Sequence, residues 1–424
     1  MQTASADVPA AVRHRTATAT VTLTGPDGAP LAGRPVTVEQ VRHDFGFGNI
    51  GFDFIELAND EPGSGPRVFG GARAEQAEHL AELWFDLYNT ATLPFYWRGF
   101  EPERGRPDTR RLHRTAQWFG EHGVAVKGHP LLWHTMAPRW LLDVPADELV
   151  DVVRARIRRE VTDFADVVDM WDAINEAVIM PVFTAEVNAI TPLAQRLGRV
   201  ETVRLAFDTA REAGATTLVL NDFNMSPAYE RLIAECLDAG VQIDAIGLQS
   251  HMHQGWWGQE KTHDVLERFS RFGLPLHFSE TTLVSGALMP PEIEDLNDYQ
   301  PEHWPSTPEG EERQAQEMVQ HYRTLVEHPA VQVITYWGLS DDGAWLGAPS
   351  GLVRADGTPK PSYDALRGLI KGTWWLAPTT VVSGGQGRVA VNGFTGTYQL
   401  TVGGRSATVE LDDSGALDVA ARLT

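Results

Sequence analysis

The stretch VVDMWDAINEAVIM, Val167–Met180, is the segment on which prediction of the fold turns. It starts as an apolar run and stops abruptly at Asn175 and Glu176, an amide beside a carboxylic acid. Taken alone, such a polar end indicates a helix cap or a strand that meets solvent. The stretch becomes informative because seven other segments of the chain have the same form.

These apolar runs alternate with longer helix-period segments between residues 42 and 372. Near-continuous apolar strands joined by helices are typical of a parallel sheet covered on both faces. Eight of them predict an α/β fold, a (β/α)₈ TIM barrel with enlarged loops. A doubly wound open sheet is the alternative, but no G-x-G-x-x-G motif follows the first run. The runs are HDFGFGNIGF, LYNTATLPFYW, VAVKGHPLLWH, VVDMWDAINE, TTLVLNDFN, DAIGLQSHM, PLHFSE and VQVITYWG.

The two ends of the chain have a different pattern. Residues 16–41 and 387–411 alternate apolar and polar residues between turns rich in glycine. Neither end has enough strands to bury a core by itself, and the termini of a domain often lie close together. We therefore predict that residues 1–41 and 373–424 pair into one small accessory β-sandwich, and that residues 42–372 form the barrel.

The composition limits the class of protein and its partners. A hydrophobic fraction of 42% with 13 tryptophans is typical of a well-packed globular protein. The net charge of −22 argues against nucleic acid or an anionic membrane as partner. Cys236 is the single cysteine, so no intramolecular disulfide can form. No segment resembles a signal peptide or a membrane span, so we expect a cytoplasmic protein, or a secreted one if a leader has been removed.

Polar and aromatic residues follow the predicted strands, and in a TIM barrel the carboxyl ends of the strands meet at one face. Glu176 and Glu280 follow the fourth and seventh strands, so we expect them to face each other across the mouth. Two opposed carboxyl groups suit hydrolysis of a glycosidic bond, with one protonated and one ionised, roughly 5–5.5 Å apart in retaining enzymes. The other strand ends carry Trp97, His134, Asn175, Asn221-Asp222, Gln249-Ser250-His251 and Trp337.

Several motifs resemble glycoside hydrolase family 10, the xylanase family. WDAINEA is similar to the family's W-D-V-V-N-E-A and GHPLLWH to its G-H-T-L-V-W-H. NDFN, IDAIGLQSH, HFSE and YWGLSDDGAW resemble N-D-Y-N, I-D-G-I-G-x-Q-S-H, I-T-E and V-W-G-x-x-D-x-x-S-W. The motifs occur in family order over roughly residues 43 to 372, and the β-rich ends lie outside the resemblance.

The resemblance implies a retaining endo-1,4-β-xylanase-like enzyme that needs no cofactor and no metal. It implies that Glu176 is the acid/base and Glu280 the nucleophile. The resemblance also implies contacts to the sugar or to the nucleophile from Asn175, His134, Gln249 and His251. Trp337 and Trp345 would form the walls of the glycone side. We also count Trp97, with Trp133, among the aromatic faces for sugar rings, and expect Trp171 in the core.

The sequence departs from the family at the end of the second strand. Leu93 and Tyr96 replace the Asn and Lys of E-N-x-x-K-W, which grip a further sugar on the glycone side. Thr282 replaces an acid that supports the histidine beside the nucleophile, and Thr135-Met136 replace S-Q. The alternative is therefore a glycosidase that acts on small plant glycosides or oligosaccharides rather than on polymeric xylan.

Two other classes remain open. A metal-dependent barrel hydrolase would use His251 and His253, with Asp222 and Glu280 completing the site. A non-catalytic sugar-binding protein would need neither carboxyl group. Under every hypothesis except that of the metal-dependent hydrolase, the partner is a β-linked carbohydrate.

Overall fold

A closed eight-stranded barrel forms the larger part of the protein. The structure is a computed structural model, and it describes residues 2–61, 76–412 and 417–423. The barrel strands follow one another in chain order, and every pair whose register is known is parallel. The strands are β4 Gly46–Ile50, β5 Thr90–Pro94, β6 Ala125–His129, β7 Met170–Asn175, β8 Thr217–Asp222, β9 Ala245–Met252, β10 Leu276–Leu283 and β11 Val331–Tyr336. The prediction of a (β/α)₈ barrel is confirmed, and an open doubly wound sheet is excluded.

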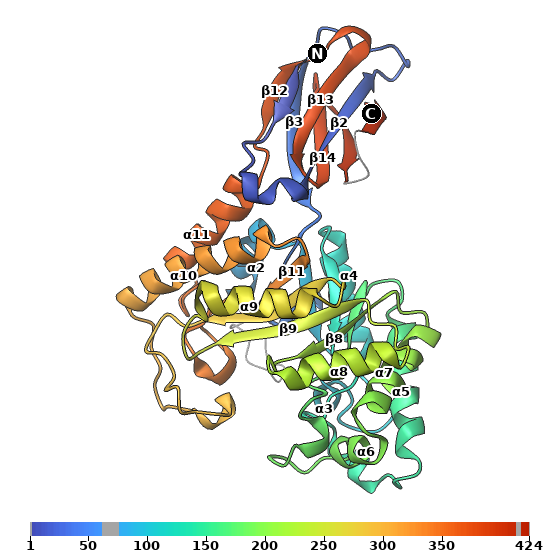
Figure 1. The fold of residues 1–424 in the computed structure, drawn as a ribbon. Helices are drawn as coiled ribbons and strands as arrows, with labels where there is room; N and C mark the ends of the chain where they lie inside the picture. Colours follow the sequence, from blue (N-terminus) through green and yellow to red (C-terminus); the bar gives the residue numbers. More distant parts are fainter. Residues whose placement is uncertain (1, 62–75, 413–416, 424) are drawn as a thin grey trace. The chain divides into compact units, whose positions relative to one another are not determined.

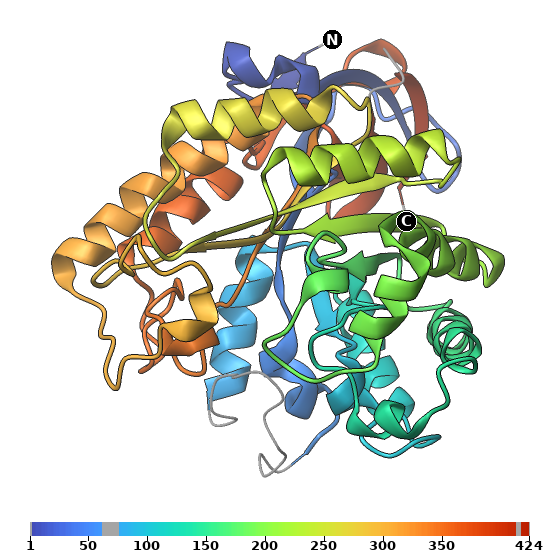
Figure 2. The same ribbon diagram turned by 60° about the horizontal axis from the view of Figure 1, so that its bottom comes forward.

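Helices form the crossovers between successive barrel strands. Figures 1 and 2 show α8 and α9 covering the outer side of strands β8 and β9. The α-helices are α1 Ile55–Ala58, α2 Ala77–Leu87, α3 Trp97–Phe100, α4 Thr109–Glu121, α5 Leu149–Asp163, α6 Ile190–Leu197, α7 Arg199–Glu212, α8 Pro227–Asp238, α9 Gly258–Ser270, α10 Pro308–Glu327 and α11 Pro361–Gly368. Each barrel strand is buried along most of its length, as expected of strands covered on both faces.

Strands from the two chain ends form two further four-stranded sheets (Figure 1). One has the order β1-β13-β2-β16 and the other β12-β3-β14-β15. The bounds are β1 Thr3–Ser5, β2 Thr16–Thr24, β3 Pro35–His43, β12 Thr379–Val382, β13 Arg388–Phe394, β14 Gly396–Val402, β15 Arg405–Leu411 and β16 Leu417–Arg422. Val21 and Val389 of the first sheet share one core with Val38, Tyr398 and Leu400 of the second. The predicted sandwich of N- and C-terminal strands is confirmed.

The chain divides into two compact units. The larger comprises Phe47–Thr324 and Ala330–Ser362, and the smaller comprises Met1–Gly46, Leu325–Pro329 and Tyr363–Thr424. Three strands come from the N-terminal end and five from the C-terminal end, and each of the two sheets contains strands from both ends. None of the helices in the described ranges is long and apolar enough to cross a membrane.

The packing of β6 against β7 depends on one glycine. A Cβ on Gly128 would lie 2.2 Å from Cζ3 of Trp171, whose ring is 2% exposed and packs 4.7 Å from Phe95. Trp171 therefore lies in the core, as predicted. We expect Gly128→Ala to lower the free energy of unfolding by about 2 kcal/mol or more, because the buried ring has no space to move into. Denaturant unfolding measures this.

Gly120→Ala is the matched control. Gly120 lies in α4, and a Cβ there meets nothing within 4 Å. Alanine is favoured over glycine in a helix by about 0.5–1 kcal/mol, so this variant should unfold at the same or slightly higher denaturant concentration. Equal stability of the two variants would contradict the packing described for Trp171.

Candidate active site

Glu176 stands one residue beyond β7, at the carboxyl end of the barrel. Its backbone is left-handed, with φ of 58°, a conformation that is uncommon without glycine. Its N–H donates to the carbonyl of Asn221 at 2.8 Å, and its own carbonyl accepts from Met180 at 3.2 Å. Asp222 fixes the next turn, because its Oδ2 accepts from the N–H of Val178 at 3.0 Å. The end of β8 therefore holds the backbone around Glu176.

The carboxyl group of Glu176 is shielded from water. Burial raises its pKa to about 8, and the charges of Asp222 and Glu280 act in the same direction. The indole Nε1 of Trp133 donates to Oε2 at 2.8 Å, which opposes the rise without cancelling it. At neutral pH this group is mostly protonated, so it can donate a proton to a leaving oxygen.

Glu280 lies inside β10 rather than at the end of the strand, where we expected it. The pairing of β10 with β9 shifts register between His277 and Glu280, and such irregularities re-aim side chains. Glu280 Oε1 accepts from Asn221 Nδ2 at 2.9 Å, and Oε2 lies 3.0 Å from His251 Nε2. The side chain is 6% exposed. Both carboxylate oxygens are therefore contacted by nitrogen atoms, one from β8 and one from the adjacent strand β9.

An amide network joins the two acidic positions. Asn221 Nδ2 also donates to Asn175 Oδ1 at 2.9 Å, and Gln249 Nε2 donates to the same oxygen at 3.0 Å. Asn221 Oδ1 accepts from the hydroxyl of Ser279. A Cβ on Gly247 would lie 2.4 Å from Asn221 Oδ1, so glycine makes room for this amide. Because both contacts of Asn175 use its oxygen, its Nδ2 is the group that can donate to a ligand.

Sequence reasoning missed a buried polar chain behind Glu280. His129 Nδ1 lies 2.6 Å from Asp172 Oδ2, and its Nε2 lies 3.9 Å from Glu280 Oε1. Lys127 Nζ binds the same Asp172 oxygen at 2.9 Å. Burial would raise the pKa of Asp172, but Lys127 and His129 outweigh it and the pKa is lowered. A signal was available, because Lys127 and His129 are two residues apart on one strand and therefore share a face.

His134 lies beside Glu176 rather than beside Glu280. The side chain is fully buried, with Nε2 4.0 Å from Glu176 Oε2 and its ring 4.3 Å from that of Phe183. Neither ring nitrogen has a hydrogen-bond partner in the described part of the chain, and burial lowers the pKa to about 3. His134 is therefore neutral and enclosed, and His129 is the histidine of this segment that lies near Glu280.

Two of the predicted tryptophans lie beside Glu280. The Trp337 ring is 5.3 Å from that of His129 and 6.2 Å from that of His251. Trp345 lies in a short 3₁₀ turn, Trp345–Gly347, with its ring 4.7 Å from that of His251. The structure thus brings Trp337 and Trp345 together with Gln249, His251, Asn175 and both acids.

Trp97 is not part of this cluster. It begins α3, where its indole donates to Glu101 Oε2 at 3.0 Å and its ring packs 5.7 Å from Trp140. The guanidinium of Arg156 lies 4.6 Å from the ring centroid. Trp97 is 5% exposed, and these contacts give it a packing role.

The residues of the metal alternative do not form a ligand set. Throughout residues 2–61, 76–412 and 417–423, no group of three His, Cys, Asp or Glu side chains is placed to hold a metal ion. His251 points its Nε2 at Glu280, and the ring of His253 lies 6.0 Å from that of His251. Asp222 Oδ2 is taken by the backbone of Val178.

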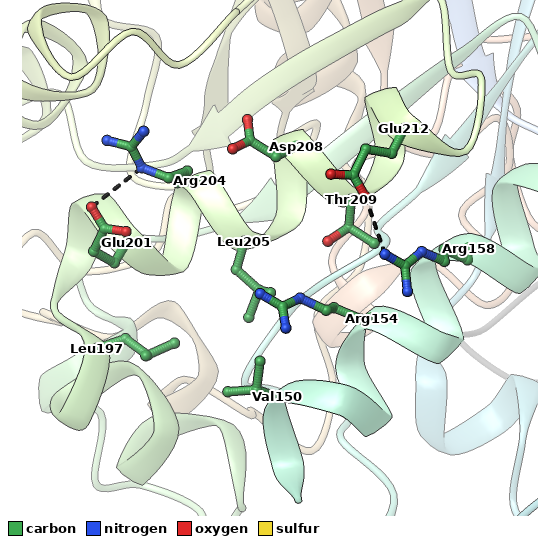
Figure 3. Close-up of a pocket in the computed structure, with 10 residues that line it drawn as sticks. All are labelled: Val150, Arg154, Arg158, Leu197, Glu201, Arg204, Leu205, Asp208, Thr209 and Glu212. Carbon is green, nitrogen blue, oxygen red and sulfur yellow. Dashed lines mark hydrogen bonds and ion pairs between the residues drawn. The ribbon is translucent and has the colours of Figure 1, made fainter. Parts of the chain in front are cut away.

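A pocket on the outside of the barrel lies away from these residues (Figure 3). It is bordered by α5 and α7, and its ion pairs are Arg204–Glu201 at 3.2 Å and Arg158–Glu212 at 3.1 Å. These pairs join largely exposed side chains and contribute little to stability. None of the residues around Glu176 and Glu280 lines the pocket, whose lining consists of Val150, Arg154, Arg158, Leu197, Glu201, Arg204, Leu205, Asp208, Thr209 and Glu212.

Comparison with known proteins agrees with this barrel and places the chain among the glycoside hydrolases. The model of the family "Glycosyl hydrolase family 10" matches residues 89–368, and the chain belongs to this family.

Curated relatives are xylanases at low identity. Endo-1,4-beta-xylanase B of Thermotoga neapolitana is 26% identical over 316 residues, covering 70% of this chain and 84% of the relative. An endo-1,4-beta-xylanase of Geobacillus stearothermophilus is 28% identical over 271 residues, covering 61% of this chain and 78% of the relative. Identities this low fit a divergent member of the family.

Solved structures share the fold. Native xylanase 10B of Thermotoga maritima superposes with a TM-score of 0.61 at 23% identity, covering 77% of this chain and 95% of that one. Xylanase 10B of Thermotoga petrophila RKU-1 in complex with xylobiose gives 0.61 at 22% identity, covering 77% and 94%. At these identities the likeness concerns the fold.

The raised pKa of Glu176 predicts how stability depends on pH. A carboxyl group that ionises near pH 4.5 when unfolded and near 8 when folded destabilises the native state as pH rises through this window. Glu176→Gln removes the ionisation. We expect the variant to match the wild-type protein near pH 4 and to become more stable by a few kcal/mol near pH 8.

Thermal unfolding of both proteins between pH 4 and pH 9 measures the difference. Glu230→Gln is the control, because Glu230 is 7% exposed but pairs with Arg268 and Arg271 on the outer helices. Its loss should destabilise the protein at neutral pH. A Glu176→Gln stability difference that does not grow with pH would contradict the buried, protonated state of Glu176.

Proposed function

We propose that the protein is a retaining β-glycosidase that cleaves β-1,4-linked xylo-oligosaccharides or xylan by double displacement. A carboxylate oxygen of Glu280 attacks the anomeric carbon, while Glu176 gives its proton to the leaving glycosidic oxygen. The bond to the leaving group breaks and a glycosyl ester on Glu280 forms. Glu176, now ionised, removes a proton from water, which attacks the same carbon and releases Glu280.

The unequal environment of the two carboxyl groups carries this proposal. Burial keeps Glu176 protonated near neutral pH, as a proton donor requires. Glu280 has Asn221 Nδ2 and His251 Nε2 at its two oxygens, an arrangement suited to an attacking carboxylate. Asn175 stands next to Glu176 and uses its Oδ1 to accept from Asn221 and Gln249, so its Nδ2 is the group that fits a contact with a hydroxyl of the sugar being cleaved.

The glycone side favours a second candidate, a glycosidase for small glycosides. Tyr96 is 5% exposed, and its ring lies 6.0 Å from that of Phe52 and 5.5 Å from that of His129. Phe52 in turn lies 5.9 Å from Trp337, and Leu93 is fully buried. Neither position offers the amide or the amine that the family has there, so a second glycone sugar would find little polar contact.

Initial rates on three substrates separate the two candidates. An aryl β-xyloside, an aryl β-xylobioside and soluble xylan are compared, each with and without EDTA. A xylanase hydrolyses the xylobioside and xylan faster than the xyloside. A small-glycoside enzyme prefers the xyloside. Rates that collapse in EDTA would instead favour the metal alternative.

Variants of the two acids test their roles on the active substrate. Glu280→Gln should leave at most about a thousandth of the rate on every substrate, because the nucleophile is lost. Glu176→Gln should slow hydrolysis of substrates with a poor, alkyl leaving group by about 10²–10⁴-fold. Hydrolysis of dinitrophenyl glycosides should be slowed much less, because dinitrophenolate departs without a proton.

The control variant Glu230→Gln, when folded, should keep a rate within about twofold of the wild-type rate. Activity that survives in Glu280→Gln would contradict the mechanism, and binding without turnover in the wild-type protein would favour a sugar-binding protein.

A further inference from the structure

The imidazoles of His129 and His251 both lie near Glu280, and a different group contacts the Nδ1 atom of each. His129 has the carboxylate of Asp172 at its Nδ1, 2.6 Å away. His251 has the hydroxyl of Thr282 at its Nδ1, 3.4 Å away. A carboxylate only accepts hydrogen bonds, whereas a hydroxyl also donates one. The proton arrangement at His251 therefore depends on where the single proton of Thr282 goes.

Thr282 stands at the centre of three contacts. Its Oγ1 accepts from the N–H of Met252 at 3.2 Å. It lies 3.4 Å from His251 Nδ1 and 3.4 Å from the Nδ1 of a second histidine, His253. Since a hydroxyl accepts two hydrogen bonds and donates one, Thr282 can accept from one of these imidazoles and donate to the other. Two arrangements therefore satisfy the hydroxyl: it accepts from His253 and donates to His251, or it accepts from His251 and donates to His253.

The surroundings of His253 select between the two directions. The side chain is fully buried, with its ring 6.1 Å from that of Trp304 and 5.2 Å from that of Trp345. Burial lowers its pKa to about 3, so it is neutral. Its Nε2 has no hydrogen-bond partner in the described part of the chain. A buried N–H without an acceptor is rarer in proteins than a buried acceptor without a donor, which places the proton of His253 on Nδ1.

We propose that a directed hydrogen-bond chain runs from His253 Nδ1–H to Thr282, from the Thr282 hydroxyl to His251 Nδ1, and from His251 Nε2–H to Glu280. His251 is then a neutral imidazole locked in the Nε2–H form. Thr282 and His253 are positioning residues, which act on the reaction through His251. The proposal rests on the nucleophilic role proposed for Glu280, but the tautomers themselves do not.

Other ionisable groups near this chain come from neighbouring strands. His129 on β6 and Tyr96 after β5 face Glu280, and Glu176 after β7 interacts with it electrostatically. Asp172 stands behind His129, with its Oδ2 2.6 Å from Nδ1 of that histidine. The hydroxyl of Thr282 is therefore the group that sets the state of His251 from behind.

Nitrogen-15 NMR of histidine-labelled protein at pH 7 tests the direction of the chain. We expect opposite tautomers, with His253 protonated on Nδ1 alone and His251 on Nε2 alone. Spectra of His251→Asn and His253→Asn assign the signals among the 14 histidines. A wild-type His251 with both nitrogens protonated, or a His253 protonated on Nε2, would overturn the proposal. This result does not depend on any enzymatic activity.

Substitutions at Thr282 test its effect on the reaction. Thr282→Val keeps the shape and removes the hydroxyl, so kcat should fall about three- to tenfold with little change in KM. Thr282→Ser should return kcat to within about twofold of the wild-type value. Thr282→Asp supplies an acceptor only, so His251 should become doubly protonated and the acid limb of the kcat/KM profile should move to lower pH.

Thr281→Val is the matched control for the loss of a buried hydroxyl. Thr281 is fully buried on the same strand, and its hydroxyl contacts Ser250 at 2.8 Å, outside the chain. Its rate constants should stay within about twofold of the wild-type values. Equal effects of Thr281→Val and Thr282→Val, or an unchanged acid limb in Thr282→Asp with His251 still neutral, would overturn the role of Thr282. Active-site titration of each preparation corrects kcat for any unfolded fraction.

Discussion

The structure depends on holding a carboxylic acid out of water at the mouth of a barrel. Burial makes the ionised form of Glu176 unfavourable, and the nearby charges of Asp222 and Glu280 add to the effect. The backbone cannot release this side chain to solvent easily, because both its N–H and its carbonyl are bonded to neighbouring groups. The cost is offset by the surrounding fold, whose strands β7 and β8 are buried along nearly their whole length.

The second acid, Glu280, differs from Glu176 in the groups that contact its carboxylate oxygens. The side chain of Glu280 is 6% exposed against 15% for Glu176, and nitrogen groups from β8 and β9 contact its oxygens. Each of these is oriented in turn, Asn221 by Ser279 and Asn175, and His251 by Thr282. The barrel thus gives two identical side chains unequal properties through their neighbours alone. This difference is what a pair of acid and nucleophile requires.

The sequence predicts the barrel well because its strands are covered on both faces and read as unbroken apolar runs. It also places Glu176 just after β7, since polar residues at strand ends are exceptional in such runs, whereas Glu280 lies inside β10 and not at its end. The sequence is less informative about side chains in the loops that follow the strands. In GHPLLWH it does not show that His129 lies near Glu280 while His134 is enclosed, because the direction of the loop after β6 depends on tertiary packing. The packing of Trp97 also depends on tertiary structure, since the chain turns into α3 and its ring packs against Arg156. The resemblance placed Thr282 beside His251, but it gave no sign of the second contact, with His253.

The most direct test of the two-carboxylate mechanism is trapping of the glycosyl-enzyme. A 2-deoxy-2-fluoro-β-xyloside or xylobioside with a dinitrophenyl leaving group forms the covalent ester but slows its hydrolysis, because the fluorine destabilises the oxocarbenium-like transition state. Intact-mass and peptide mass spectrometry then locate the sugar. The account predicts one added glycosyl group per chain, on the peptide that contains Glu280, and none in Glu280→Gln. A label on another residue, or steady turnover of ordinary substrates with no covalent adduct under any condition, would contradict it.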